Sequence, residues 1–469
     1  MNNDHKIKKN ILSESNLLKL FMCDPQFNIS QIPNFDTYFL SALELEQLLI
    51  SWKKNIERDS TLLCRQSLSL LTDLPQDSLY SNLEYHNWYL AAQVAEVFRN
   101  PSICKNAGRL NLKQLQKNIC KWLIHADQGL SLVIAWGQPK RSAGGIKCMG
   151  PYADLAELFS ISRLITITRA IEKIVKYRIN LTVLTGGHRF YPALFTRSEL
   201  TTDYDAQRQA IADFMDDDKR IKFLPFIRHN EILNYSIDES QLKQISHQQI
   251  LSLLNTITLN IDWEHLLHPQ ISCRYHNPHH IELTQSLANW LSKQSIETLN
   301  QYIRQSIYYL LTNKNTQRLN ADSETDEDSI QLKNLIIFMH KVAWESTKKY
   351  IVIQEMNHLK QREALGDQHF RLSVHEKDDL NNQPAILTLG VNGGNQLSQH
   401  VIAFLKNRVL HFGAFSEFWD SEPVLIKLNS DCDYQLFNWL KQSEQALCIS
   451  NMPNEELLPF LNMSSRLVN

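Results

Sequence analysis

Ser-Leu-Val-Ile-Ala-Trp at 131–136 and Asn-Leu-Thr-Val-Leu at 180–184 are two short apolar runs, typical of buried strands. Between them lie a glycine-rich loop at 137–150 and an amphipathic stretch at 151–177, which predicts a helix. Strand, loop, helix and strand in this order predict a parallel βαβ unit. Ligands of such sheets bind at the carboxyl ends of the strands, in the loops that lead to the helices.

The same alternation extends outward from this unit. A helix at 204–215 and a strand at 221–226 follow it, and β character returns after residue 370. Further strands are predicted at 370–375, 385–389, 400–405 and 424–428, with a helix at 434–443. Apolar residues at three- and four-residue spacing predict helices elsewhere, at 38–56, 88–98, 239–257, 281–311 and 330–362.

These elements predict an α/β protein, with a Rossmann-like core built on a mostly parallel sheet and with added helical parts. The expected regions are a helical N-terminal region (1–125), a first part of the catalytic core (126–230), a helical insertion (231–335) and a second part of the core (336–469). The helical parts should pack on the core. The N-terminal region could pack on the core, cover it or form a homodimer interface. The acidic stretch 322–328 is interpreted as a solvated loop.

Composition narrows the class of protein. The 469 residues are 43% hydrophobic and 21% charged, and the net charge is −2, so no strong field favours nucleic acid or an anionic membrane as partner. No apolar run reaches the roughly 18 residues of a membrane-spanning helix, and the polar start lacks a signal peptide's apolar core. We therefore expect a cytoplasmic protein whose eight scattered cysteines are reduced core residues.

Glycine marks the loops that could carry chemistry. Only 13 glycines are present, and nine of them fall in 137–150, 186–187 and 390–394. The first window holds Lys140, Arg141 and Lys147 just before a predicted helix, where cations and backbone N–H groups would bind phosphate or carboxylate. It has no Walker A motif, so a nucleoside triphosphate is not indicated. A solvated basic loop is the alternative.

Asp154 and Glu157 follow in the first turns of that helix, three residues apart and so on one face. Carboxylates can hold an ammonium ion or take its proton. The alternative is that they only stabilise the helix N-terminus, where acids are favoured by the dipole.

The second window, Gly186-Gly187-His188-Arg189, comes directly after a strand. A histidine and an arginine at that place suit anion binding or proton transfer, whereas a plain surface turn is the alternative.

Alternation within the strand at 370–375 puts Arg371, Ser373 and His375 on one face. This pattern is typical of an active site or of an exposed face. Other motifs do not indicate a function. The third glycine window lacks the dinucleotide-binding fingerprint, and the GxSxG motif of serine hydrolases is absent from the sequence. Histidines 265, 268, 276, 279 and 280 have no accompanying HExxH motif or cysteine pair, so no metal site is expected.

Three blocks, in order, resemble the isonitrile (isocyanide) synthases, which are grouped with pyoverdine and dityrosine biosynthesis enzymes. The segment 140–157 resembles the family's Lys-Gly-Pro-Asp-Glu block, through Lys147, Gly150, Pro151, Asp154 and Glu157. Thr185–Phe190 resembles its Ser-Asp-Gly-x-x-Phe loop, and Arg371–His375 its Arg-Leu-Ser-Ile-His block. His400 stands where the family has a histidine. Gly186 replaces the family's aspartate, and Ser398-Gln399 replace its Pro-Trp pair, which marks a divergent member.

The resemblance implies a reaction that joins the amino group of an amino acid to the ketone of ribulose 5-phosphate and fragments the sugar, leaving an isonitrile. That scheme requires no redox or metal cofactor. The partners it implies are the two small molecules, and a downstream iron/2-oxoglutarate oxygenase could take the product. Another carbon–nitrogen-forming enzyme or lyase, or a non-catalytic binding or scaffold protein, are the alternatives.

Roles follow on the same basis. Lys147 and Arg371 are predicted to bind the anionic ends of the substrates, with Lys147 also a candidate for a transient imine. His188 and His375 are predicted to move protons, and Asp154 and Glu157 to orient or deprotonate the amine. The remaining predicted substrate-binding residues are Lys140, Arg141, Gly186, Gly187, Arg189, Ser373 and His400.

Overall fold

The fold is known from a computed structural model. It describes residues 36–69, 82–136, 140, 148, 150, 152–185, 198–225, 368–375, 383–414, 418, 424–429, 432, 435–441 and 447–463. The helices predicted at 239–257, 281–311 and 330–362 lie outside the described residues, as do the acidic stretch 322–328 and the five histidines at 265–280.

The βαβ unit predicted from the sequence forms a four-stranded parallel sheet. Its strands are β2 (Leu130–Ala135), β3 (Ile179–Thr185), β4 (Ile221–Pro225) and β5 (His369–Leu372). They lie in the order β4-β3-β2-β5, and every neighbouring pair is parallel. The α/β class is thus confirmed, and the carboxyl ends of all four strands share one edge.

A second sheet departs from the single core sheet expected from the sequence. It contains β1 (Thr37–Leu40), β6 (Ile402–Lys406), β7 (Val409–Gly413), β8 (Val424–Leu428) and β9 (Cys448–Ser450). Their order is β1-β8-β9-β6-β7, with two parallel and two antiparallel pairs. The tight turn at 407–408 makes β6 and β7 a hairpin, which a parallel sheet cannot contain.

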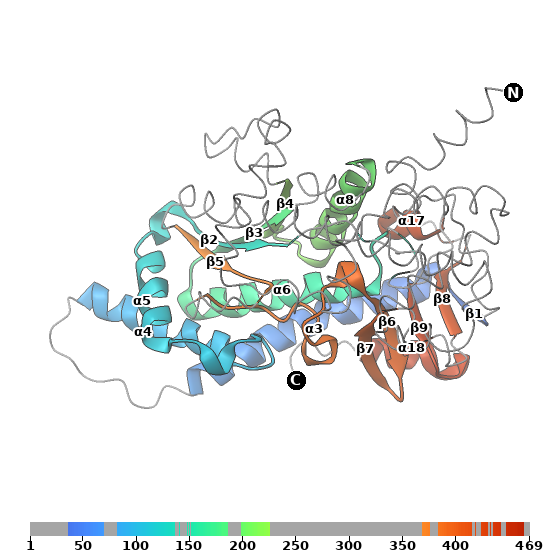
Figure 1. Ribbon diagram of the computed structural model, residues 1–469, viewed down its shortest axis with the longest axis horizontal. Coiled ribbons are helices and arrows are strands. Elements are labelled where there is room, and N and C mark those ends of the chain that lie inside the picture. The colour runs from blue at the N-terminus through green and yellow to red at the C-terminus, as the bar shows by residue number, and fades with distance from the viewer. Residues whose placement is uncertain are drawn as a thin grey trace, which may run out of the picture.

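Helix α6 (Leu155–Val175) runs through the middle of the molecule (Figure 1). Eighteen of its 21 residues are buried, because it contacts neighbours on all sides, as a helix apolar around its whole circumference must. Those neighbours include α3 (Ala42–Ser69), α4 (Asn82–Arg99), α8 (Ser198–Met215), and strands of both sheets. The predicted N-terminal helices therefore pack directly on the core helix.

The remaining helices are shorter. They are α5 (Leu112–Leu123), α17 (Asn438–Lys441) and α18 (Asn454–Met463). The helix predicted at 434–443 is a 3₁₀ turn, Gln435–Phe437, that leads into α17. The strand predicted at 385–389 is only a pair of isolated bridges, at Ala385 and Ile386. Within the described ranges, no helix is long and apolar enough to cross a bilayer.

The first described element differs from its prediction for a clear reason. The sequence predicts one helix from residue 38, but Thr37–Leu40 pairs with β8 and the helix begins at Ala42. Ser41 and Glu44 form reciprocal bonds: Ser41 N donates to Glu44 Oε2 (2.8 Å), and Glu44 N to Ser41 Oγ (3.4 Å). This capping arrangement fixes the N-terminus of the helix directly after Ser41.

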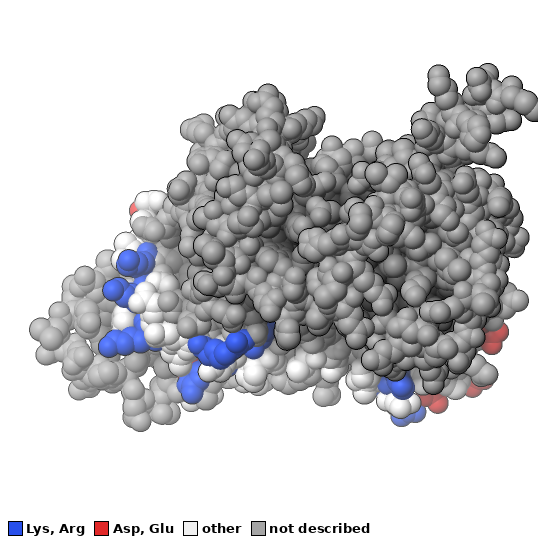
Figure 2. Space-filling view, viewed as in Figure 1, with Lys and Arg blue, Asp and Glu red and all other residues white. Residues whose placement is uncertain are grey.

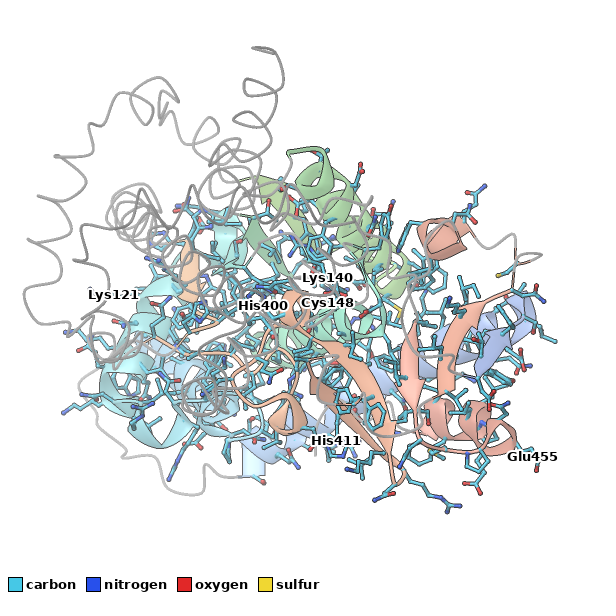
Figure 3. All side chains as sticks on the ribbon, turned by 45° about the vertical axis from the view of Figure 1, so that its right-hand side comes forward. Lys121, Lys140, Cys148, His400, His411 and Glu455 are labelled. Carbon is cyan, nitrogen blue, oxygen red and sulfur yellow. The ribbon has the colours of Figure 1, made fainter. Side chains whose placement is uncertain are left out.

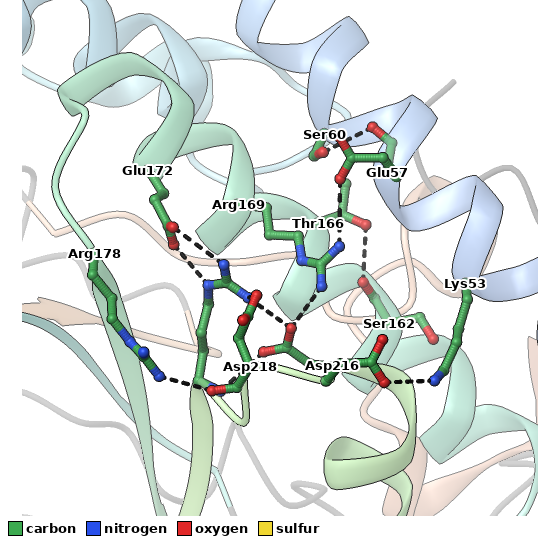
Figure 4. A network of polar contacts seen from close by, with 12 residues as sticks. Lys53, Glu57, Ser60, Ser162, Thr166, Arg169, Glu172, Arg178, Asp216 and Asp218 are labelled. Carbon is green, nitrogen blue, oxygen red and sulfur yellow. Dashed lines mark hydrogen bonds and ion pairs between the residues drawn. The ribbon is translucent and has the colours of Figure 1, made fainter.

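An ion-pair network ties α3 to α6 and to the turn before β4 (Figure 4). Glu57 on α3 accepts from Arg169 and Lys173 on α6. Arg169 also donates to Asp216 Oδ1 (2.7 Å), and Arg220 donates to the same oxygen (2.7 Å). The buried Asp216 carboxylate thus joins two arginines from separate elements.

Candidate functional site

The site is built at the carboxyl edge of the four-stranded sheet. Trp136 directly follows β2, and its backbone N–H donates to Leu184 O on β3 (3.1 Å). The start of α6 and the side chains of α8 face this edge, as the following contacts show. The carboxyl ends of β2, β3 and β4 lie together at this edge, and ligands of parallel sheets bind at such an edge.

Lys140, Asp154 and Glu157 form a buried charged cluster, which we call the α6 cluster. Lys140 Nζ lies 2.8 Å from Asp154 Oδ2 and 2.8 Å from Glu157 Oε2, and all three side chains are at most 1% exposed. Asp154 is the N-cap of α6: its Oδ1 accepts from Ala156 N (2.8 Å), while Glu157 Oε2 accepts from Asp154 N (2.9 Å). The capping box therefore fixes both carboxylates where Lys140 meets them.

Burial and charge act in opposite directions in this cluster. Burial raises the pKa of the Asp154 carboxyl to about 7, with Glu157 adding to the rise and Lys140 opposing it. Burial also works against the charged form of Lys140, but the Asp154 and Glu157 carboxylates outweigh it and raise its pKa above the ordinary value. Lys140 therefore stays protonated at neutral pH, which makes it a cation and not a nucleophile.

Two side chains of α8 complete the arrangement, and sequence reasoning missed both. The Tyr204 hydroxyl donates to Glu157 Oε1 (2.7 Å), and burial together with the Glu157 carboxylate raises the pKa of Tyr204. One turn later, the buried guanidinium of Arg208 pairs with Asp205. It lies 5.3 Å from the ring centre of Trp136, 4.5 Å from that of Tyr204 and 4.8 Å from that of Phe223.

The turn Ser398–His400 packs against the same edge. Trp136 Nε1 donates to Gln399 Oε1 (2.9 Å), and the Cys148 thiol lies 3.6 Å from Gln399 O and 3.7 Å from Val401 O. The half-buried His400 is thereby brought toward the end of β2. Figure 3 shows Lys140, Cys148 and His400 near the centre of the molecule, with Lys121 and Glu455 at its periphery.

The third block lies on β5, beside β2. Arg371 pairs in register with Val133 and is half-buried, whereas His375 is exposed on a bend beyond the strand end. Ser373 Oγ accepts from His375 N (3.1 Å) and donates to His375 O (2.7 Å). The alternation predicted for this segment holds, since Phe370, Leu372 and Val374 are buried, but β5 ends at Leu372.

A family model for pyoverdine/dityrosine biosynthesis proteins matches residues 125–389, more than half of the chain. The chain belongs to the pyoverdine/dityrosine biosynthesis family. Among solved structures, the PvcA protein of Pseudomonas aeruginosa is 15% identical with a TM-score of 0.43, and the likeness covers 72% of this chain and 97% of that one. No curated protein matches the chain.

The matched span contains the α6 cluster, α8 and β5, and so includes the blocks on which the family resemblance was based. Lys140, Asp154 and Glu157 are in direct contact. Arg371 lies on β5, the strand that pairs with β2, and Ser373 and His375 follow after the end of β5. Lys140, which was predicted to bind a substrate anion, forms ion pairs with two carboxylates. The predicted residues that lie outside the described part of this family member are Arg141, Lys147, Gly186, Gly187, His188 and Arg189.

One feature of the sequence could have indicated Tyr204 and Arg208. They are four residues apart, and therefore on one face of the predicted helix that follows the second glycine window. A tyrosine on an amphipathic helix is commonly part of the core, so the spacing alone did not single it out. Among the described residues of this family member, no group of three or more His, Cys, Asp or Glu side chains is arranged to hold a metal ion.

Proposed function

We propose that this protein is an isonitrile synthase-type enzyme, which condenses the amino group of an amino acid with the ketone of ribulose 5-phosphate. The family match over 125–389 supports a biosynthetic enzyme of this type. The observation that carries the proposal is the α6 cluster, where a carboxyl group with a raised pKa, a fixed cation and a tyrosine hydroxyl meet at the carboxyl edge of a parallel sheet.

The chemistry of the cluster fits the first step of that reaction. Attack of an amine on a ketone requires removal of a proton from nitrogen and delivery of a proton to the departing oxygen. A carboxyl group whose pKa lies near 7 does both at neutral pH. We propose Asp154 for this exchange. Glu157 accepts from its backbone N–H and is itself bonded by Tyr204, and Lys140 is the cation that keeps the two carboxylates together.

The other residues keep their predicted roles as parts of this proposal. Lys147 and Arg371 bind the anionic substrate ends, and His188 and His375 transfer protons. Arg141, Gly186, Gly187, Arg189, Ser373 and His400 line the substrate site. Gln399 stands where the family has a tryptophan, and it accepts a hydrogen bond from Trp136. This departure leaves open which amino acid is the substrate and whether a related carbon–nitrogen-forming reaction takes place.

The test is to incubate purified protein with ribulose 5-phosphate and each amino acid in turn, and to detect isonitrile by tetrazine trapping and mass spectrometry. We expect isonitrile from at least one amino acid, and its loss in Asp154→Asn. Consumption of both substrates without isonitrile would favour the related reaction. No turnover with any sugar phosphate and amine, together with a stable protein partner in pull-downs, would favour the scaffold alternative.

A further inference from the structure

The turn between α4 and α5 reaches across the fold to the end of β5. Two backbone hydrogen bonds join this turn to the segment after residue 384: Lys105 N donates to Ala385 O (2.8 Å), and Leu387 N donates to Ile103 O (2.8 Å). Cys104 and Ile386 form an antiparallel bridge between the same two stretches. The N-terminal region is thus bonded to residues 385–387, and an isolated bridge between Ala385 and Ser373 joins this segment to the end of β5.

Residues 384–386 in turn bond to Ser373, which comes just before the bend at residues 374–375. Ile386 N donates to Ser373 O (2.7 Å), and Ser373 N donates to Pro384 O (2.9 Å). Because Ser373 is bonded through its hydroxyl to the backbone of His375, whatever fixes residues 384–386 also fixes the bend that carries the imidazole.

Two side chains of the α4–α5 turn reinforce this connection. Lys105 Nζ donates to Val374 O (2.8 Å) and to Asn395 O (3.2 Å). Asn106 Nδ2 donates to Gln383 O (2.9 Å), while its Oδ1 accepts from Ala385 N (2.9 Å). Asn106 is 7% exposed and Val374 3% exposed. The Asn106 bonds and the Lys105–Val374 bond are therefore at least partly buried, whereas the bond from Lys105 to Asn395 O is exposed.

We propose that Lys105 is a positioning residue for His375, and that the N-terminal region serves the site through it. The inference rests on the proposed function, in which His375 transfers a proton. The His375 side chain is exposed, and the direction in which it extends is set in part by its backbone. Lys105 donates a charge-assisted bond to the carbonyl directly before it, and such bonds are among the stronger ones in proteins.

The experiment compares Lys105→Met with Lys105→Arg in the full chain. Methionine keeps an apolar stem of similar length but has no donor, whereas arginine keeps the charge and can still reach a carbonyl. For Lys105→Met we expect kcat to fall about ten- to a hundredfold, the effect of a small misplacement of a reacting group, with KM within about twofold. Amide hydrogen exchange across 373–376 should accelerate, and Lys105→Arg should restore both values.

The matched control is Lys113→Met, because the Lys113 side chain on α5 is exposed. Figure 2 shows Lys and Arg atoms gathered on the side of the molecule where α5 lies. An unchanged melting temperature of Lys105→Met separates positioning from loss of the fold. If that variant melts early, Lys105→Gln, which keeps a neutral donor, takes its place.

Unchanged exchange across 373–376 in Lys105→Met would overturn the proposal, and so would faster exchange with unchanged kcat. The exchange measurement needs no substrate. If the wild-type protein makes no isonitrile, the proposed function fails, yet the exchange rates of the same variants still decide whether Lys105 fixes the bend.

Discussion

At the scale of single residues, Lys140 is the group on which the α6 cluster depends. It neutralises one of two carboxylates that are both removed from water. A buried charge that loses its partner is left without compensation, and such losses cost about 3–5 kcal/mol. We therefore expect Lys140→Met to lower the free energy of unfolding by about that amount, as measured by urea denaturation. Lys113→Met on the surface should leave it unchanged, and equal stability of the two variants would contradict the role given to Lys140.

Asp154 makes a prediction about pH. Its pKa is raised from 3.8 to about 7 in the folded protein, so between those values the folded state holds a proton that the unfolded chain releases. The resulting stabilisation is full below about pH 4 and is lost as the pH rises through 7.

Asparagine caps a helix as well as aspartate does but does not titrate. The stability of the wild type relative to Asp154→Asn should therefore decrease from pH 4 to pH 7, in urea titrations at each pH. Asp127→Asn, a change at an exposed aspartate, is the control, for which the difference should stay flat. A flat difference for Asp154→Asn would refute the raised pKa.

At the scale of elements, Asp216 links α6 to the start of β4. Burial works against its charge, but the bonds from Arg169 and Arg220 outweigh this and hold the pKa of Asp216 below its usual range. A lowered pKa gives stability that is present at neutral pH and lost as the pH falls through the folded value. Hydrogen bonds to charged groups contribute about 1.5–3 kcal/mol, and Asp216→Asn should lose about that much at pH 7 and much less near pH 3.

The adjacent Asp217 provides the control for that measurement. Its side chain is 84% exposed and pairs with Lys53 at 2.9 Å. Exposed pairs contribute about 0–1 kcal/mol, so Asp217→Asn should alter the unfolding curve little at either pH. Similar losses in the two variants would show that the Asp216 network adds no more than a surface ion pair.

Elements also show what the sequence could predict. The buried parallel strands β2, β3 and β4 were predicted to within one residue at each end, because a strand covered on both faces is apolar throughout. Strand β1 was missed, since its partner β8 lies far away in the sequence and only that pairing makes Thr37–Leu40 extended. The Ser41-x-x-Glu44 capping signal was present in the sequence, and it would have placed the start of the helix correctly.

The site was predictable in the same uneven way. Asp154 and Glu157 could be placed on one helix face from their spacing alone. The contact of Lys140 with both carboxylates could not be predicted. The position of Lys140 is set by the path of the loop after β2, and such a loop has no periodic pattern in the sequence. Tyr204 could not be separated from an ordinary core tyrosine, since only its bond to Glu157 distinguishes it.

At the scale of the whole molecule, the N-terminal region is a structural part of the core. Trp52 packs edge-on against Phe159 of α6, with ring centres 5.7 Å apart, and Phe98 stacks on Phe370 of β5 at 5.8 Å. We predict that a chain beginning at residue 126 exposes these apolar faces and aggregates. Size-exclusion chromatography and circular dichroism would test this, and a monomeric, cooperatively folded product would contradict it.

The pairing of β1 with β8 has a consequence for how the protein is made. Leu40 lies beside Leu428 in the finished sheet, so the ribosome must add about 390 residues after the first strand before its partner exists. At about 5–20 residues per second this takes roughly 20 to 80 s. Throughout that time α3, the helix next to β1, is without α18, one of its neighbours in the folded protein. Contacts between such distant parts of a chain form slowly, so we expect the nascent protein to be prone to aggregation until its last strands have been synthesised.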